Sequence, residues 1–246
     1  MSDYNYSGPL NGGYAIQDKN ITWELRDFCM STYEWQEFFA ADGVTDHREK
    51  FIEMFGRWIR SSQLNTINGL DAFPHVTQTN GTSEAFSMFM QRHSKRNFKF
   101  YKGDFMMHKV ASNNINAKWD WIYNYGQIRE DDAVIISCPF SDTGRVKADM
   151  NELLDWCSSL KVPVLIDMAY FGMCYGISIN VDKPCVEEVT FSLGKTFPII
   201  GARAGIRLQR TEIDDAVLFA NQHGIVNNFG AMIGEFAMSA WGPDYI

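Results

Sequence analysis

Apolar residues follow two patterns along this chain: short continuous runs, and positions spaced three or four residues apart. Continuous runs bounded by turn residues are typical of buried strands. They predict strands at residues 133–137 and 162–166, and further strands are predicted at residues 97–101, 189–192 and 204–209. The helical spacing predicts helices at residues 45–59, 81–90, 149–160, 212–223 and 230–241. The chain is therefore expected to alternate strands with helices through most of its length.

Three segments carry more particular signals. Thr45 is predicted as the N-cap of the first helix, because a hydroxyl ahead of acidic residues suits a helix start. Residues 117–129 are compatible with a helix, although their aromatic residues leave the period unresolved. Residues 1–32 contain turn signals at Gly8-Pro9 and Gly12-Gly13. We expect that segment to wrap around a neighbour rather than form core.

Strands that alternate with helices predict an α/β fold, a three-layer sandwich in which helices cover both faces of a mostly parallel sheet. The sequence contains no internal repeat, low-complexity tract or clear linker. We therefore expect one α/β domain at residues 45–246, preceded by an N-terminal extension at residues 1–44. Ligands of such sheets bind beyond the carboxyl ends of the strands, so polar residues there are the candidates for chemistry.

Composition narrows the function classes. Hydrophobic residues make up 46% of the 246 residues and aromatic residues 14%, which is typical of a globular protein. A net charge of −8 disfavours nucleic-acid binding, because phosphate backbones require an excess of Lys and Arg. No run approaches the roughly 20 apolar residues that span a membrane. Five cysteines without CxxC spacing, and a start without a signal-peptide pattern, predict a reduced cytoplasmic protein.

The segment Gly194-Lys195-Thr196 follows a predicted strand and has the last three residue types of a nucleotide-binding P-loop. That motif requires a glycine five residues before Gly194, and Val189 stands there. No GxGxxG sequence opens a helix after a strand either. We therefore reject a nucleotide site and a dinucleotide site.

Five motifs resemble, in the same order, those of the class I and II aminotransferases, which use pyridoxal 5′-phosphate (PLP). In the lysine segment, Ser192, Lys195, Arg203 and Gly205 keep the family's S-x-x-K and R-x-G spacing. The other four motifs are Phe38–Gly43 with Arg48, Asn80–Ala85, Pro139–Gly144 and Asp167–Phe171. The resemblance covers roughly residues 33–241 and implies the fold-type-I, aspartate aminotransferase-like large domain.

The resemblance implies that Lys195 holds PLP as a Schiff base and then moves protons at the substrate α-carbon. Asp167 would face the pyridine nitrogen and keep it protonated, which makes the ring an electron sink. Tyr170 would donate a hydrogen bond to the phenolic oxygen of the cofactor. Taken without the resemblance, Lys195 would be read as a surface lysine, and Asp167 equally well as a turn cap.

The phosphate of the cofactor needs hydrogen-bond donors, and the resemblance assigns five residues to it. Arg203 would contact the phosphate through paired N–H groups, and Ser192 offers a hydroxyl. Gly81, Thr82 and Ser83 would add amides and hydroxyls at a helix start, where the helix dipole favours an anion. The same three residues would also serve as a simple N-cap.

An aromatic residue and a histidine three positions later fit another pair of family positions. The resemblance implies that Phe105 stacks on the cofactor ring and that His108 hydrogen-bonds Asp167. From the residues alone, Phe105 equally fits an ordinary core position and His108 a structural one. The remaining histidines have no metal-ligand spacing, so no metal site is predicted.

The chain departs from the family pattern at three positions and in length. Ser141, which we still place at the cofactor, replaces an asparagine that meets the phenolic oxygen, and Asp142 replaces a proline. Phe38 replaces a tyrosine that reaches the phosphate of the partner subunit. Family members also carry a C-terminal small domain whose arginine binds the substrate carboxylate. We expect that domain to be absent from these 246 residues.

The resemblance implies an aminotransferase that moves an amino group between an amino acid and a 2-oxo acid, in a homodimer with sites at the interface. Two alternatives remain open. One is a catalytically incomplete PLP-binding protein, since the substrate-anchoring domain is expected to be absent. The other is a lyase, racemase or decarboxylase of the same family, because the same lysine and aspartate serve those reactions.

Overall fold

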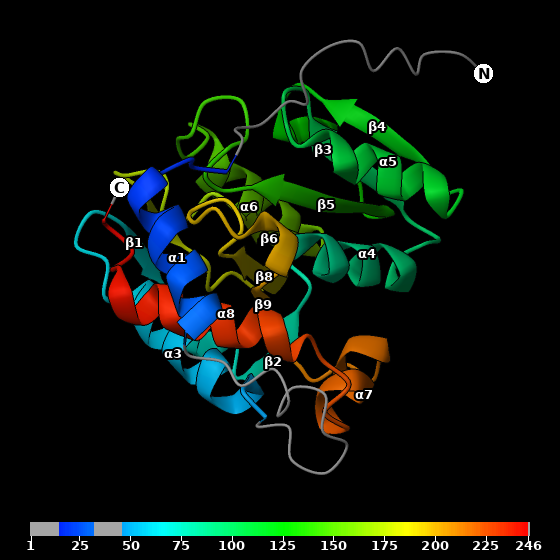
Figure 1. The fold of residues 1–246 in the computed structure, drawn as a ribbon. Helices are drawn as coiled ribbons and strands as arrows, with labels where there is room; N and C mark the ends of the chain where they lie inside the picture. Colours follow the sequence, from blue (N-terminus) through cyan, green and yellow to red (C-terminus); the bar gives the residue numbers. More distant parts are fainter. Residues whose placement is uncertain (1–14, 32–45, 246) are drawn as a thin grey trace.

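The structure is a computed structural model that describes residues 15–31 and 46–245 (Figure 1). Its centre is a seven-stranded sheet with the order β2-β9-β8-β6-β5-β3-β4. All strands of this sheet run parallel except β9, which is antiparallel to both of its neighbours. The strands are β2 (His75–Thr79), β3 (Asn97–Tyr101), β4 (Trp119–Ile122), β5 (Asp132–Ser137), β6 (Val164–Met168), β8 (Val186–Ser192) and β9 (Gly205–Gln209).

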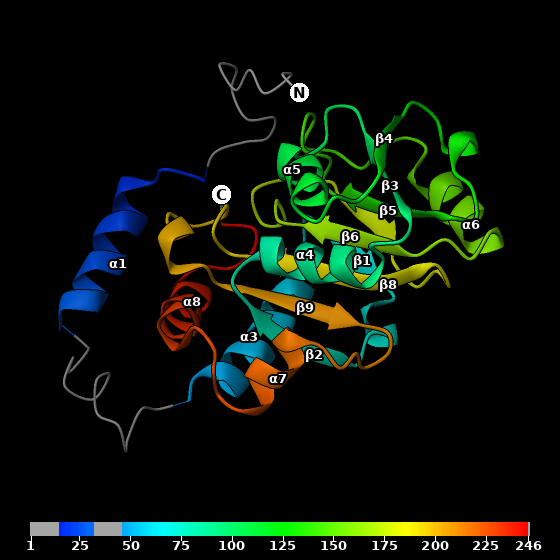
Figure 2. The same ribbon diagram turned by 90° about the vertical axis from the view of Figure 1, so that its right-hand side faces the viewer.

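Helices cover both faces of the sheet (Figures 1 and 2). The helices are α1 (Lys19–Ser31), α3 (Arg48–Arg60), α4 (Thr82–Arg92), α5 (Met106–Asn114), α6 (Met150–Ser159), α7 (Ala216–Gln222) and α8 (Asn228–Ala240). Short 3₁₀ turns and a separate pair of parallel strands complete the described elements: η1 (Leu70–Ala72), η2 (Tyr125–Gln127), η3 (Ile200–Ala202), β1 (Thr66–Asn68) and β7 (Ser178–Asn180).

Alternate side chains of the central strand β5 pack on opposite faces of the sheet. In β5, Ala133 and Ile135 pack in a cluster with apolar side chains of α4 and α5, whereas Val134 and Ile136 pack in a larger cluster with α1, α3, α6 and α8. Both faces of the sheet are therefore covered by apolar side chains, which explains why the central strands are continuous apolar runs in the sequence. The predicted α/β fold class is confirmed, with the mostly parallel sheet between two helical layers.

The predicted helix at residues 117–129 is wrong. The structure places the edge strand β4 and the turn η2 there. Trp119 and Trp121 lie next to each other and both contact Phe100, while Asp120 between them pairs with Lys99. A side-chain period of two, with the tryptophans on one face of the strand, replaces the helical period.

The expectation that residues 1–32 form no core is also wrong for the part that the structure describes. Helix α1 places Ile21 and Leu25 in the larger core cluster, and Phe28 stacks on Phe236 of α8 with ring centroids 4.1 Å apart. The Phe38–Gly43 motif, Thr45 and the boundary at residue 44 lie outside the described residues. Helix α3 begins at Arg48, with His47 as its N-cap.

Two elements begin later than predicted, the strand β6 and the helix α7. The backbone N–H of Val162 donates to the carbonyl of Cys157, so Val162 still belongs to the turn after α6. Strand β6 begins at Val164 and includes Asp167. Helix α7 begins only at Ala216, because the Asp215 side chain caps it by accepting two backbone N–H groups. Asp167 is consequently a strand residue, held on both sides by neighbouring strands.

Candidate active site

The carboxyl ends of the parallel strands bring the candidate residues to one edge of the sheet. Asp167 in β6 lies opposite Thr190 of β8. Ser192, the last residue of β8, pairs with Gly205, where the antiparallel β9 begins. Because β9 starts where its neighbours end, the turn that carries Arg203 reaches the same edge.

Asp167 is a buried carboxylate, 1% exposed, that is held by three donors. The Thr82 hydroxyl and the His108 ring each lie 3.2 Å from its Oδ2, and the backbone N–H of Ala169 donates to Oδ1 at 3.0 Å. Since a carboxylate accepts, the His108 hydrogen in this contact is on Nε2. An ionised carboxylate has about four acceptor positions, so Asp167 keeps capacity for one more donor.

Aromatic rings surround His108 and form an apolar wall beside Asp167. The ring centroids of Phe86, Phe105 and Phe100 lie 4.8, 5.6 and 5.9 Å from that of His108. Phe105 is half-buried and meets the imidazole edge-on. Nδ1 of His108 has no hydrogen-bond partner among the described residues, so the contact with Asp167 determines how the ring is held.

The turn before α4 and the turn before β9 together form a cradle of donors. Gly81 has φ +74°, and a Cβ there would lie 3.1 Å from the Arg203 guanidinium and 3.5 Å from the Ser192 hydroxyl. Arg203 donates to Asn80 O at 2.8 Å and lies 3.4 Å from the Ser83 hydroxyl. The N-cap of α4 is Gly81, which has no side chain to cap the helix. Helix-start amides beside a guanidinium are suited to an anion.

Lys195 follows β8, in the loop that leads to η3. Its Nζ is 5.7 Å from the centroid of the Tyr170 ring. Burial lowers the pKa of the Lys195 amine below its ordinary value; the Asp167 carboxylate opposes this, and the Arg203 guanidinium adds to it. The backbone carbonyl of Lys195 accepts a hydrogen bond from Ile16 at 2.9 Å, so the segment before α1 contacts this turn.

Ser141 is buried in the loop after β5 and bonds within the protein. Its hydroxyl donates to Asp104 Oδ1 at 3.0 Å and lies 3.2 Å from the Ser137 hydroxyl. Asp104, 1% exposed, follows β3 and also accepts the backbone N–H groups of Ser137 and Phe105. No motif in the sequence pointed to this role of Asp104. The rule about strand ends, applied to β3, would have identified it.

The structure thus groups the sequence candidates into two adjoining sets. The first surrounds the carboxylate and consists of Asp167, Thr82, His108 and Phe105. The second surrounds the cradle and consists of Gly81, Ser83, Ser192 and Arg203. Lys195 and Tyr170 lie near each other. The charges of Asp167, from the first set, and Arg203, from the second, both affect the pKa of the Lys195 amine. The Thr82 hydroxyl bonds to Asp167, whereas the sequence analysis assigned it to the phosphate.

Among residues 15–31 and 46–245, no group of His, Cys, Asp and Glu side chains could hold a metal ion. In the same part of the chain, no helix has the length and apolar character needed to cross a bilayer.

A comparison with protein families identifies the chain at the level of the family. The model described as "Aminotransferase class I and II" matches residues 85–240, more than half of the sequence. That match includes Asp167, Lys195 and Arg203. A search of curated proteins finds no match.

Solved structures with the same fold come from several bacterial proteins. A PLP-bound putative aminotransferase from Clostridium difficile 630 has a TM-score of 0.68 at 16% identity, over 91% of this chain and 62% of that one. The histidinol-phosphate aminotransferase from Clostridium acetobutylicum has a TM-score of 0.63 at 14% identity, over 95% and 69%. The PLP-bound C-S lyase from Staphylococcus hominis has 0.62 at 12%, over 90% and 61%. At these identities the likeness establishes the fold alone.

Proposed function

The chain belongs to the class I and II aminotransferase family, and we propose that it binds PLP and transfers an amino group between an amino acid and a 2-oxo acid through Lys195. The chain spans 62% of the length of the Clostridium difficile structure. The strongest support is the position of the Lys195 amine, whose pKa is lowered first by burial and is then affected by both Asp167 and Arg203. One small ligand at Lys195 can therefore meet both charges.

The residues present fit PLP on three counts. Asp167 is a buried acceptor with spare capacity, which suits a protonated pyridine nitrogen. Around Gly81, the Arg203 guanidinium and the Ser192 hydroxyl supply donors for a phosphate, and both lie within 3.5 Å of the Cβ position of this glycine. The amine of lowered pKa at Lys195 suits an aldehyde.

When bound, PLP supplies an aldehyde that condenses with amines and a ring that accepts electron density from the substrate α-carbon. Asp167 holds the proton on the pyridine nitrogen, and Thr82 and His108 keep that carboxylate in place. Arg203, Ser192 and the start of α4 bind the phosphate and fix the position of the ring. Lys195 Nζ would take the proton from the substrate α-carbon and pass it to the cofactor carbon bound to the amino nitrogen, because its lowered pKa increases the neutral fraction of the amine.

Reduction of the PLP-loaded protein with borohydride, followed by peptide mass analysis, tests the role of Lys195. We expect a visible absorbance band on PLP addition and a phosphopyridoxyl mass increase on the peptide that contains Lys195. Lys195→Ala should lose both signals. The matched control is Lys118→Ala, since Lys118 is exposed and outside the site. An unchanged band and a mass increase elsewhere in Lys195→Ala would remove Lys195 from this role.

A panel of amino donors and 2-oxo acids separates the candidate activities. Amino transfer should release a new 2-oxo acid and a new amino acid in equal amounts. A lyase would release its product without needing a 2-oxo acid acceptor. A PLP-binding protein without turnover would form the band and release nothing.

We further propose a cytoplasmic homodimer. The cysteines at positions 29, 138, 157, 174 and 185 are free thiols, which fits a reducing compartment. The family resemblance supports a dimer with its sites at the subunit interface. Light scattering of the PLP-loaded protein checks the assembly, and a mass of a single chain at micromolar concentration would contradict it.

A further inference from the structure

Asp104 is a buried carboxylate at the candidate site to which the sequence analysis assigned no role. It accepts the backbone N–H of Phe105 at 2.7 Å, the backbone N–H of Ser137 at 3.0 Å and the Ser141 hydroxyl at 3.0 Å. These three donors belong to the start of α5, the end of β5 and the loop after β5. A single carboxylate therefore ties three segments together two strands away from Asp167.

The hydrogen of the Ser141 hydroxyl is used in this network. A serine hydroxyl has one hydrogen, and Ser141 has two oxygens within reach, Asp104 Oδ1 at 3.0 Å and Ser137 Oγ at 3.2 Å. The carboxylate is the nearer and the charged acceptor, so it takes the hydrogen. Ser141 then has only lone pairs to offer to any other group.

The position of Ser141 relative to PLP follows from the sheet order, and this step rests on the proposed function. The phosphate cradle lies at β2, β9 and β8, and Asp167 lies on β6. In PLP the phosphate arm and the phenolic oxygen are attached on opposite sides of the axis that joins the ring nitrogen to the aldehyde carbon. The phenolic oxygen therefore faces the next strand, β5, whose following loop contains Ser141.

We propose that Asp104 is a positioning residue that commits the Ser141 hydroxyl to Asp104, so that Ser141 cannot donate a hydrogen bond to the phenolic oxygen of bound PLP. Tyr170 is then the hydroxyl donor at that oxygen. A phenolate with one donor instead of two is less stabilised, and the proton that it shares with the Lys195 nitrogen is held to higher pH. Asp104 thus affects the pH at which the Lys195 nitrogen joined to PLP loses its proton, although Asp104 itself does not contact the cofactor.

The test is the pH midpoint of the visible absorbance band of the PLP-loaded protein. Ser141→Ala should leave the midpoint unchanged to within about 0.3 unit, because Ser141 donates nothing to the phenolic oxygen. Asp104→Ala should lower it by about one unit, since it removes the carboxylate that accepts the Ser141 hydrogen and the hydroxyl can then donate. In Asp104→Ala/Ser141→Ala, the midpoint should return most of the way to the wild-type value. Asp167, Arg203 and Tyr170, which face Lys195, are intact in all three variants.

Two outcomes would overturn the proposal. A midpoint raised by Ser141→Ala would mean that Ser141 donates in the native protein. A double variant with the midpoint of Asp104→Ala would mean that the carboxylate acts by its charge alone. If Asp104→Ala does not fold by circular dichroism, Ser141→Ala decides the question by itself. Absence of any PLP band in the wild-type protein would instead contradict the proposed function, so the two failures are distinguishable.

Discussion

At the scale of single residues, Gly81 determines whether the cradle has room for an anion. Its backbone has φ +74° and ψ 179°, a conformation that side chains with a Cβ rarely adopt. A Cβ atom at this position would also contact the Arg203 guanidinium and the Ser192 hydroxyl. Backbone conformation and free space therefore both require glycine here.

Gly81→Ala should reduce PLP affinity by about tenfold or more, because a charge-assisted hydrogen bond contributes about 1.5–3 kcal/mol and the new methyl group obstructs such bonds. Titration of PLP by absorbance measures this. Gly176→Ala is the matched control, since Gly176 also has φ +74° but nothing within 4 Å of its Cβ position. Equal losses in the two variants would mean that backbone strain, and not the cradle, is responsible.

The sequence could indicate Gly81, Asp167, Lys195 and Arg203, because each follows a strand or opens a helix at a recognisable spacing. It could not assign the partners of shorter side chains. The Thr82 hydroxyl bonds to Asp167, 85 residues away in the chain. Asp104 and Ser141 meet only because β3 and β5 are neighbours in the sheet. Such choices depend on tertiary positions that no local pattern contains.

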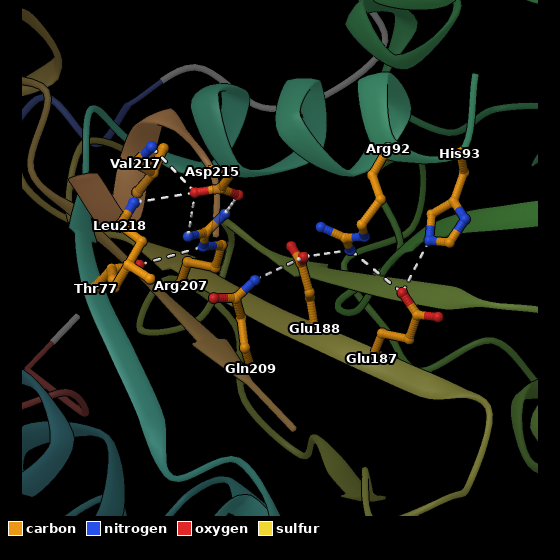
Figure 3. Close-up of polar contacts among 10 residues, drawn as sticks. All are labelled: Thr77, Arg92, His93, Glu187, Glu188, Arg207, Gln209, Asp215, Val217 and Leu218. Carbon is orange, nitrogen blue, oxygen red and sulfur yellow. Dashed lines mark hydrogen bonds and ion pairs between the residues drawn. The ribbon is translucent and has the colours of Figure 1, made fainter. Parts of the chain in front are cut away.

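At the scale of elements, both ends of α4 are fixed. Its first residue, Thr82, bonds to Asp167, and its last residue, Arg92, reaches β8 (Figure 3). Glu188 of β8 is fully buried and accepts from Arg92 and from Gln209 of β9. His93, the C-cap of α4, and Arg92 both contact Glu187. The helix start at the candidate site is thus anchored through the opposite end of the helix.

Arg92→Met should lower stability by about 3 kcal/mol, because it leaves the Glu188 carboxylate buried without its cation. For a domain of this size the Tm should fall by roughly 6–12 °C. Calorimetry measures the change, with Arg60→Met as the control, since the Arg60–Asp71 pair is solvent-exposed and should contribute little. Similar Tm values for the two variants would show that the Glu188 network is not stabilising.

The N-cap of helix α7 leads us to expect that the stability of the protein decreases in acid. Asp215 caps this helix and accepts two N–H groups of the fully buried Arg207 (Figure 3). Burial alone would raise the pKa of Asp215, but the hydrogen bonds and charge of Arg207, with the backbone bonds from Val217 and Leu218, hold it below its ordinary value. A lowered folded-state pKa stabilises the protein above the unfolded value of about 3.9, and that contribution is lost as pH falls through the folded value.

Asp215→Asn should therefore be less stable than the native protein at pH 7, with a smaller decrease in stability from pH 5 to pH 3. Asparagine keeps the helix cap through its oxygen but cannot accept from Arg207 in place of Oδ2, so the comparison isolates the pair with Arg207. Urea unfolding at pH 7, 5 and 3 measures both effects. Asp71→Asn provides the control, because Asp71 is almost fully exposed. Parallel stability curves for the native protein and Asp215→Asn would contradict the assignment.

At the scale of the whole molecule, segments distant in the sequence close the layer opposite α4 and α5. Helix α1 lies against α8, where Phe28 stacks on Phe236, and α8 also packs on α3 through Gly234, whose Cβ position meets Phe51. The pattern of residues 230–241 correctly predicted a helix, which the structure shows as α8. The pattern of α1 gave no such signal, because two buried apolar residues, Ile21 and Leu25, are too few to stand out beside the turn residues that precede them.

This arrangement connects the first described segment to the candidate site. Ile21 is fully buried in the larger core cluster, and the backbone N–H of Ile16 donates to the carbonyl of Lys195. Ile21→Ala should lower stability by about 2–5 kcal/mol through the cavity it leaves, which corresponds to a Tm decrease of roughly 4–20 °C. Trp23→Ala, on the exposed face of the same helix, should change the Tm little.

Hydrogen exchange measured on the same two variants extends this prediction to the site. Loosening α1 should speed exchange of the Ile16 amide in Ile21→Ala, because that amide is protected by the Lys195 carbonyl. The amide of Val134, in the centre of the sheet, should keep its protection relative to global unfolding. Equal Tm values and unchanged Ile16 exchange in both variants would mean that α1 packs too weakly in solution to support the Lys195 turn.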